Sequence, residues 1–305
     1  MLRMASLVYQ RLKMKFGQLL CLCVLLISVW ILTNKSGTTQ RLNEIFITKT
    51  SMDLKGKAPQ PERVLTDATY QGAAQDDPAL VTYVRHLMKP PSTLPYNLTH
   101  PEKQHFSQYR QTQHADATYF HGKREGFFVE VGAVDGETFS NSLYLERNLG
   151  WSGLLIEVFQ ITYKALLQKH RKAYSINAAL SFKNCSTEVG FVKRGGKLAM
   201  ISRTFSDRGE RIQAIPLYTM LLALNTTVID FFSLDIEGGE MKVLMTIPWD
   251  KVKVGVLVVE SNIIPEGRKF LVDYMTSKGY KFIGHRGIDS WFILPELVNQ
   301  YIMKH

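Results

Sequence analysis

Residues 126–141 read GFFVEVGAVDGETFSN, and this stretch decides the fold. Its apolar start predicts a short buried strand. The spacing Glu130-x-Gly132-x-x-x-Gly136 then predicts a tight turn, because glycines let the backbone come close to a ligand. The serine and asparagine residues that follow are typical of a helix N-terminus. A strand, a glycine turn and a helix start together predict a nucleotide-type site at the edge of a parallel sheet.

The charges of this turn indicate the kind of ligand. Glu130, Asp135 and Glu137 lie in it, and it has no Lys. An acidic lining disfavours a polyphosphate but attracts a ligand with a cationic centre and an ammonium group, such as S-adenosylmethionine. The alternative interpretation is a strand and turn that serve the fold alone.

The next segments continue the same alternation of strands and helices. Residues 153–157 are a second apolar run that ends in Glu157, the position where a doubly wound sheet contacts ribose hydroxyls. Residues 160–172 have the pattern of an amphipathic helix. Residues 173–180 are the predicted third strand, on which Asn177 is expected to hydrogen-bond an adenine edge. The candidate cofactor contacts are therefore Glu130, Gly132, Asp135, Gly136, Glu157 and Asn177.

Two later strands also end in carboxylates. The apolar run from Val228 leads into Asp235, Glu237 and Glu240, and residues 254–260 end in Glu260. Because parallel strands present their carboxyl ends at one edge of a sheet, we expect Glu157, the pair Asp235 and Glu237, and Glu260 on one rim.

Asp235 and Glu237 are the candidate catalytic residues. Burial at such a rim raises the pKa of a carboxyl group towards neutrality, as a general base requires. The alternative is that both residues only cap the helix that begins near Glu240.

The C-terminal part completes the predicted fold. Residues 280–284 and 290–294 have the pattern of a hairpin. The predicted class is an α/β, Rossmann-like methyltransferase sheet of seven strands, with an antiparallel last hairpin. A chain of 305 residues with 45% hydrophobic residues can bury a core of that size.

Two of these segments resemble a known family. Residues 128–137 and 229–240 are similar to the FkbM-type methyltransferase domain. Over residues 76–294 the chain more narrowly resembles the Star-like single-pass membrane proteins, whose founding member promotes export of epidermal growth factor receptor ligands. Catalytic FkbM members commonly have Lys where this chain has Ser233.

Two functions therefore remain open at this point. One is S-adenosylmethionine-dependent methyl transfer to an oxygen or nitrogen nucleophile. The other, implied by the Star-like resemblance, is a non-catalytic factor that escorts a membrane-protein client from the endoplasmic reticulum to the Golgi or endosomes. Fold alone does not decide between them.

The N-terminus predicts a membrane anchor. Residues 16–34 contain no charged residue, and as a helix they would span about 28 Å. Basic residues precede this span without an acid, so the positive-inside rule places the N-terminus in the cytosol. The predicted organisation is a cytosolic tail (1–15), a signal anchor (16–34), a lumenal stem (35–75) and the methyltransferase-like domain (76–305). A cleavable signal peptide is the alternative.

Three of the four glycosylation sequons, at Asn97, Asn184 and Asn225, agree with a type II protein whose domain lies in the lumen of the secretory pathway, and the fourth, at Asn34, abuts the predicted anchor. The net charge of +10 is spread along the chain, and no basic stripe interleaved with aromatic residues predicts nucleic-acid binding. The basic segment 193–211 is expected either to cover the cofactor pocket or to form a solvated hairpin. Histidines between residues 100 and 121 lack the spacing of metal ligands, so no metal site is predicted.

Overall fold

A computed structural model describes residues 70–194, 198–202 and 210–302. The predicted tail, the signal anchor and the stem up to residue 69 lie outside these ranges. None of the helices within them combines the length and the apolar character that a membrane crossing requires.

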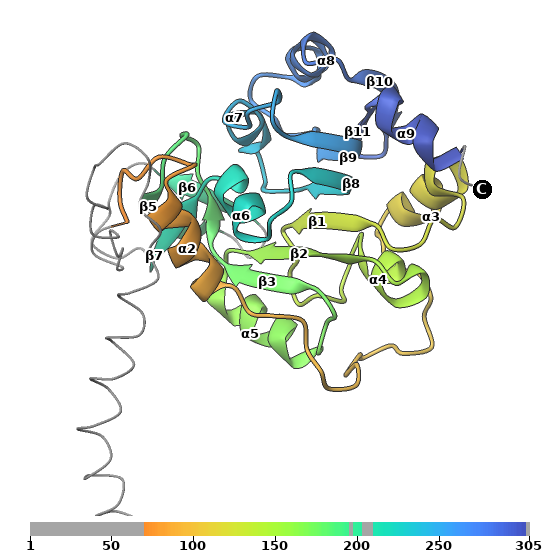
Figure 1. The fold of residues 1–305 in the computed structure, drawn as a ribbon, viewed down its shortest axis with the longest axis horizontal. Helices are drawn as coiled ribbons and strands as arrows, with labels where there is room; N and C mark the ends of the chain where they lie inside the picture. Colours follow the sequence, from red (N-terminus) through yellow and green to blue (C-terminus); the bar gives the residue numbers. More distant parts are fainter. Residues whose placement is uncertain (1–69, 195–197, 203–209, 303–305) are drawn as a thin grey trace, which may run out of the picture. The chain divides into compact units, whose positions relative to one another are not determined.

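A seven-stranded sheet forms the centre of the domain, in the order β10-β11-β9-β8-β1-β2-β3 (Figure 1). The strands from β9 to β3 are all parallel, β11 pairs with β9 antiparallel, and β10 pairs with β11 antiparallel. This topology confirms the predicted α/β sheet of seven strands with an antiparallel last hairpin. The strands are β1 (Phe127–Val131), β2 (Ser152–Glu157), β3 (Tyr174–Asn177), β8 (Val228–Leu234), β9 (Lys253–Glu260), β10 (Lys281–Arg286) and β11 (Asp289–Ile293).

Side chains alternate between the two faces of each strand, so the sheet has a core on each face. On β1, Val129 and Val131 pack into one core and Phe128 into the other. The first core receives side chains from α2 (Pro78–Leu87), α6 (Leu217–Ala223), α7 (Glu240–Leu244) and α8 (Arg268–Ser277). The second receives side chains from α3 (Gln111–Ala115), η1 (Asp116–Phe120), α4 (Leu143–Leu149), α5 (Gln160–Gln168) and α9 (Pro295–Ile302).

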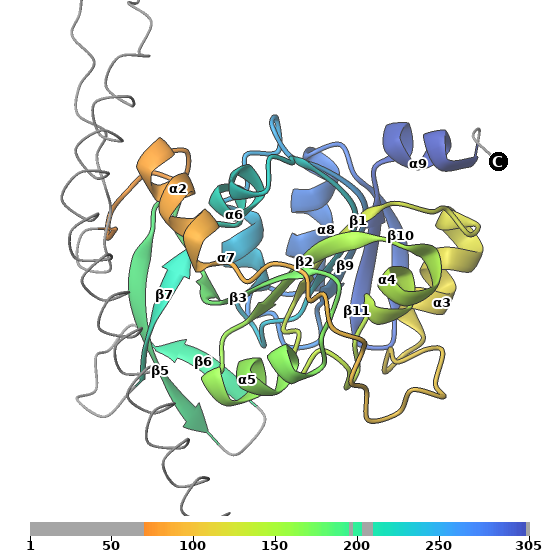
Figure 2. The same ribbon diagram turned by 60° about the horizontal axis from the view of Figure 1, so that its bottom comes forward.

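A second, four-stranded sheet is inserted after β3, in the order β4-β7-β5-β6. Figure 2 shows β5, β6 and β7 of this sheet. The prediction of one strand over residues 173–180 is wrong in its extent, because β3 ends at Asn177 and, after one intervening residue, the chain enters the second sheet at Ala179. Ala179 and Leu180 pair with Ala214 and Ile215 instead. The strands are β4 (Ala179–Leu180), β5 (Thr187–Arg194), β6 (Leu198–Ser202) and β7 (Glu210–Ile215).

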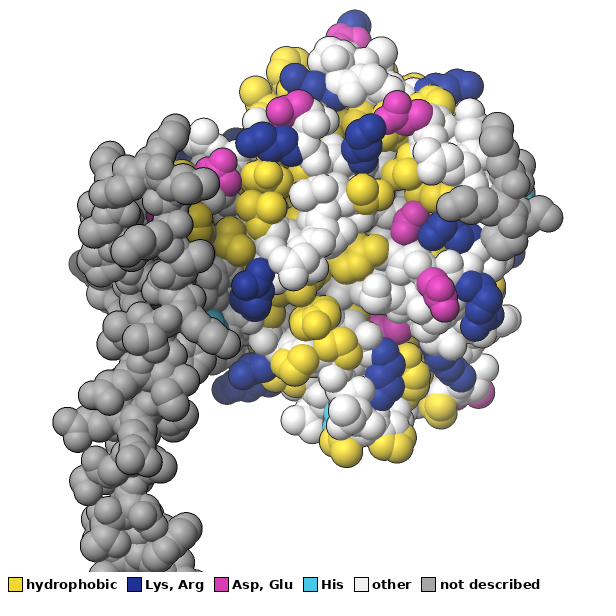
Figure 3. All heavy atoms as spheres, in the orientation of Figure 1, with side chains coloured by type: hydrophobic (Ala, Val, Ile, Leu, Met, Phe, Trp, Pro, Cys, Tyr) yellow, Lys and Arg dark blue, Asp and Glu magenta, His cyan; other side chains and the backbone are white. Residues whose placement is uncertain are grey.

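Of the basic segment, residues 193–194, 198–202 and 210–211 belong to this sheet, in which β5 and β6 pair antiparallel. On the face shown in Figure 3, Lys and Arg side chains are interspersed with Asp and Glu. The expected absence of a nucleic-acid partner stays a prediction.

Residues 70–75, assigned to the stem by sequence, pack with the domain. Tyr70 and Ala73 are buried in the first core. The Gly72 amide donates to the carbonyl oxygen of Ser186 over 2.7 Å, and the Gln75 amide donates to that of Asn184 over 2.9 Å. The folded part therefore begins at least six residues before the predicted boundary at residue 76.

Candidate active site

The turn after β1 lies against the turn after β8. Gly132 is exposed and has φ +81°, and a Cβ atom there would lie 2.3 Å from the carbonyl oxygen of Asp235. A glycine is therefore required by contact with Asp235 as well as by its backbone conformation. This contact brings a predicted cofactor residue and a predicted catalytic residue together.

Glu130 holds the loop that follows the turn. Its carboxylate accepts hydrogen bonds from Ser140 Oγ (2.9 Å), the Asn141 amide (2.6 Å) and Ser142 Oγ. Burial raises the pKa of Glu130, while the charge of Arg171 and these hydrogen bonds oppose the shift. Glu130 is therefore engaged by the protein and supports the site from behind.

The remaining acids of the turn are engaged in the same way. Asp135 Oδ1 accepts from the amides of Glu137 (3.0 Å) and Thr138 (2.6 Å), which shapes the loop. Burial would raise the pKa of Glu137, but hydrogen bonds from Lys169 and from the Thr99 and His100 amides lower it to about 2. The Lys169 Nζ and Glu137 Oε2 atoms lie 2.6 Å apart. The acidic lining inferred from sequence is thus largely satisfied within the protein.

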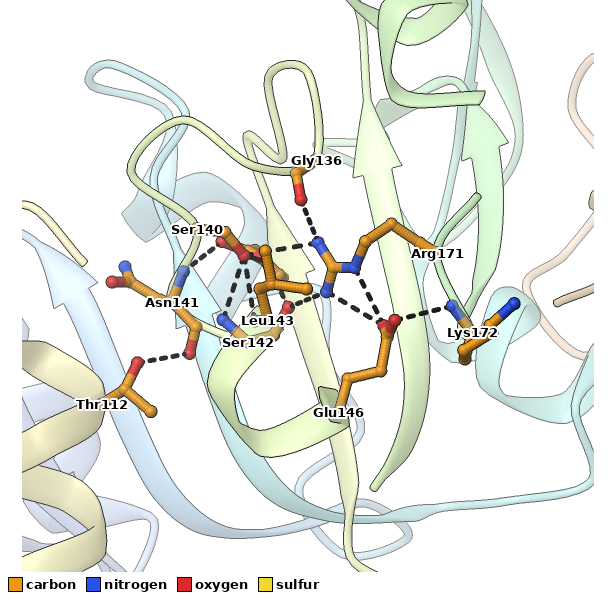
Figure 4. A network of polar contacts seen from close by, with 10 residues as sticks. Thr112, Gly136, Ser140, Asn141, Ser142, Leu143, Glu146, Arg171 and Lys172 are labelled. Carbon is orange, nitrogen blue, oxygen red and sulfur yellow. Dashed lines mark hydrogen bonds and ion pairs between the residues drawn. The ribbon is translucent and has the colours of Figure 1, made fainter. Parts of the chain in front are cut away.

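A buried arginine links this loop to α4 (Figure 4). Arg171 donates to Glu146 on α4 (Nε to Oε2, 3.0 Å), to Ser142 Oγ (3.0 Å) and to the carbonyl oxygen of Gly136. Glu146 Oε1 also accepts from the Lys172 amide over 2.6 Å. This network fixes residues 136–142 beside the rim, and sequence analysis did not find it.

Glu157 and Asn177 lie side by side at the ends of β2 and β3. The Glu157 carboxylate accepts from the amides of Val134 and Phe159, each over 2.8 Å. Asn177 Nδ2 donates to the carbonyl oxygens of Glu157 (2.8 Å) and Val158 (3.0 Å). Both residues stabilise the rim, so a contact from Asn177 to a ligand would fall to its Oδ1 atom.

Three carboxylates converge at the ends of β8 and β9. Asp235, Glu240 and Glu260 each offer an oxygen, and these oxygens lie within 4.8 Å of one another. Burial, the negative charge of Asp235 and a hydrogen bond with it raise the pKa of Glu260 to about 9. Glu240 also accepts from the amides of Ile236 (2.9 Å) and Gly238 (3.0 Å) at the start of α7. Sequence analysis placed Asp235 and Glu260 on one rim and Glu240 among the carboxylates that follow β8, but it did not predict that Glu240 would join the other two.

Glu237 lies beside this group without joining it. It is half-buried and has φ +60°. Burial and the charges of Asp235 and Glu240 raise its pKa. The rise has the direction that the sequence-based hypothesis of a general base requires.

Ser233 is buried on β8, one residue before that strand ends at Leu234. Its Oγ accepts from Asn141 Nδ2 over 3.0 Å, which links β8 to the loop after β1. Its short neutral side chain therefore contributes to packing and supplies no positive charge to the rim.

Among the comparisons with known proteins, the match to a family model identifies a methyltransferase domain. The family model described as "Methyltransferase FkbM domain" matches residues 130–282, which is half of the chain. No curated protein sequence matches the chain. Among solved structures, the methyltransferase FkbM from Methylobacillus flagellatus is 14% identical with a TM-score of 0.35, over 70% of this chain and 50% of that one. The chain thus spans about half the length of that protein. A TehB-like SAM-dependent methyltransferase from Corynebacterium glutamicum is 12% identical with a TM-score of 0.34, over 61% of this chain and 88% of that one.

Proposed function

This chain belongs to the FkbM methyltransferase domain family, and from that premise we propose that it transfers a methyl group from S-adenosylmethionine to an oxygen or nitrogen nucleophile. The main observation behind the proposal is the contact between Gly132 and Asp235. This contact places the exposed glycine turn beside the acidic rim. Methyl transfer needs a donor and a nucleophile held in line, so most of the rate comes from positioning.

The residues present fit the cofactor at the glycine turn. Gly132 is exposed and carries no side chain, so the backbone can approach a ligand there. Glu130 holds the loop over residues 140–142, and Glu157 holds the amide of Val134. S-adenosylmethionine would supply the electrophilic methyl group. Asp235 and Glu237 would orient or deprotonate the nucleophile.

Direct binding tests the proposal. We expect the full-length chain, solubilised in detergent, to bind S-adenosylmethionine in a saturable calorimetric titration. Gly190→Ala is the control variant and should bind the ligand as the wild-type chain does, since a Cβ atom at this glycine of the second sheet meets nothing within 4 Å. Absence of heat from the wild-type chain at millimolar ligand would refute cofactor binding and favour the escort function.

The two candidate catalytic carboxylates can be tested by shape-conserving changes. Asp235→Asn and Glu237→Gln should each lower the rate of methyl transfer on the order of a hundredfold or more. The melting temperature should change little, because the replaced groups keep their size. Asp273→Asn, at an exposed carboxylate paired with Lys269, is the control. A lowered melting temperature with unchanged rate would assign both residues to the scaffold.

The escort alternative has a specific observation in its favour. Ser233 accepts a hydrogen bond from Asn141. It leaves the rim without the positive charge of the Lys that catalytic relatives commonly have at this position. Under this alternative the chain keeps the fold, and a surface of the domain binds the membrane client.

For either function we propose a type II, single-pass protein with its domain in the secretory lumen. The charge-free span of residues 16–34 and the preceding basic residues support this topology. Asn97, Asn184 and Asn225 are all exposed, as acceptors of glycans must be. Endoglycosidase treatment of the protein from cells should lower its apparent mass. An unchanged mass, with a domain that protease digests in sealed microsomes, would exclude this topology.

A further inference from the structure

The acidic group at the ends of β8 and β9 has no cationic partner within the described residues, in contrast to two other buried carboxylates. Within the described residues, Glu137 is paired with Lys169 over 2.6 Å and Glu146 with Arg171 over 3.0 Å. No ion pair to Asp235, Glu240 or Glu260 occurs in that part of the chain. Like charges this close repel one another strongly in a partly buried site.

One oxygen of this group is unsatisfied. Glu260 is only 6% exposed, and its Oε2 atom is buried with no hydrogen-bond partner. An unpartnered buried carboxylate oxygen is unfavourable, because it has lost its hydration without a replacement. This observation is separate from the clustering and indicates that a further group belongs beside Glu260.

The chemistry and the spacing of the oxygens indicate which kind of ligand would bind beside Glu260. Asp235, Glu240 and Glu260 supply oxygen ligands, which suit hard divalent cations. Oxygens on opposite sides of such a cation lie about 4–5 Å apart, and the observed limit of 4.8 Å agrees with this. Asp235 is exposed, so a hydrated cation can reach the group from solvent.

We propose that Asp235, Glu240 and Glu260 bind one divalent cation of the Mg²⁺, Mn²⁺ or Ca²⁺ class. The cation would supply the positive charge that the rim lacks and would contact Glu260 Oε2. Cation binding itself does not depend on methyl transfer. One consequence rests on the proposed function: a cation next to the Gly132–Asp235 contact would bind an acceptor through oxygen, so the substrate class would be a hydroxyl or carboxylate compound.

The shared-proton arrangement is the competing account of the same geometry. A hydrogen bond between the Asp235 and Glu260 carboxyls requires one proton between them. In that account the group needs no cation, and the acceptor can be an oxygen or a nitrogen compound. Cation binding, measured in the absence of S-adenosylmethionine, separates the two accounts.

Mn²⁺ is the probe, because its free form has an electron paramagnetic resonance signal that weakens on binding. We expect the full-length chain in detergent to bind one Mn²⁺ with a Kd below about 1 mM, and Mg²⁺ or Ca²⁺ to compete. Glu260→Gln should raise this Kd at least tenfold, whereas Asp273→Asn, at an exposed carboxylate outside the group, should leave it unchanged.

No saturable Mn²⁺ binding by the wild-type chain, or equal binding by Glu260→Gln, would overturn the cation site. Should Glu260→Gln fail to fold, Asp235→Asn gives the same comparison. A melting temperature of the wild-type chain that rises with Mn²⁺ concentration supports the site, and a constant one counts against it. Because calorimetry with S-adenosylmethionine is a separate measurement, failure of the cation site and failure of the proposed function can be told apart.

Discussion

Replacement of Arg171 by Met should lower the free energy of unfolding by about 3–5 kcal/mol, because it leaves the charge of Glu146 buried without its partner. The side chains of Arg171 and Glu146 are 2% and 0% exposed, and their Nη2 and Oε2 atoms lie 3.0 Å apart. The change also removes the donors to Gly136 and Ser142, so the loop beside the rim should loosen. Urea unfolding of the wild-type and variant chains measures the difference.

A matched control is the ion pair between Lys253 and Glu296, whose atoms lie 2.7 Å apart but whose side chains are both more than half exposed. Lys253→Met should change the unfolding free energy by about 1 kcal/mol or less, since water screens this pair. A double replacement, Arg171→Met with Glu146→Leu, should recover part of the loss because Glu146 is then no longer a buried charge without a partner. An Arg171→Met variant as stable as Lys253→Met would contradict the role assigned to the network.

Gly132→Val should abolish S-adenosylmethionine binding and also destabilise the domain. A Cβ atom at this position would lie 2.3 Å from the Asp235 carbonyl oxygen, so the turn after β8 must move. The positive φ of Gly132 adds strain of about 1–3 kcal/mol for a residue with a side chain. Calorimetry measures the binding, and thermal unfolding measures the stability.

Gly279→Val separates the two contributions. Gly279 has φ +89°, close to that of Gly132, but a Cβ atom there meets nothing within 4 Å. This control should lose stability through backbone strain alone and keep its ligand binding. Equal losses of stability in both variants would show that the contact with Asp235 contributes nothing.

The sheet could be predicted from sequence because its strands are apolar runs bounded by glycine and carboxylate residues. Val129 and Val131 beside Gly132 are such a case, and β1 lies where the pattern placed it. The extent of β3 could not be predicted, because residues 174–180 contain no glycine or proline that would mark the end of one strand and the start of another. Only the pairing of Ala179 with Ala214, 35 positions later, shows where the second sheet begins.

The supporting contacts of the site were harder to infer than its location. Glu130 has the same strand parity as Phe128, so a period of two already places it towards the face that α4 covers. The alternation therefore indicated a supporting role for Glu130, but the neighbouring glycine motif led to the prediction of a cofactor contact. The pairing of Arg171 with Glu146 had no such signal, because a buried ion pair depends on which segments meet in space. Glu240 likewise joins the acidic group only through the turn that precedes α7.

The short passage between the two sheets has a mechanical consequence. Only Ala178, itself buried, separates β3 from β4, so a single residue joins the main sheet to the inserted one at this point. Asn177, the last residue of β3, clamps the backbone of Glu157 and Val158. A displacement of β4 would therefore reach Asn177, and through its hydrogen bonds the end of β2, over a single residue.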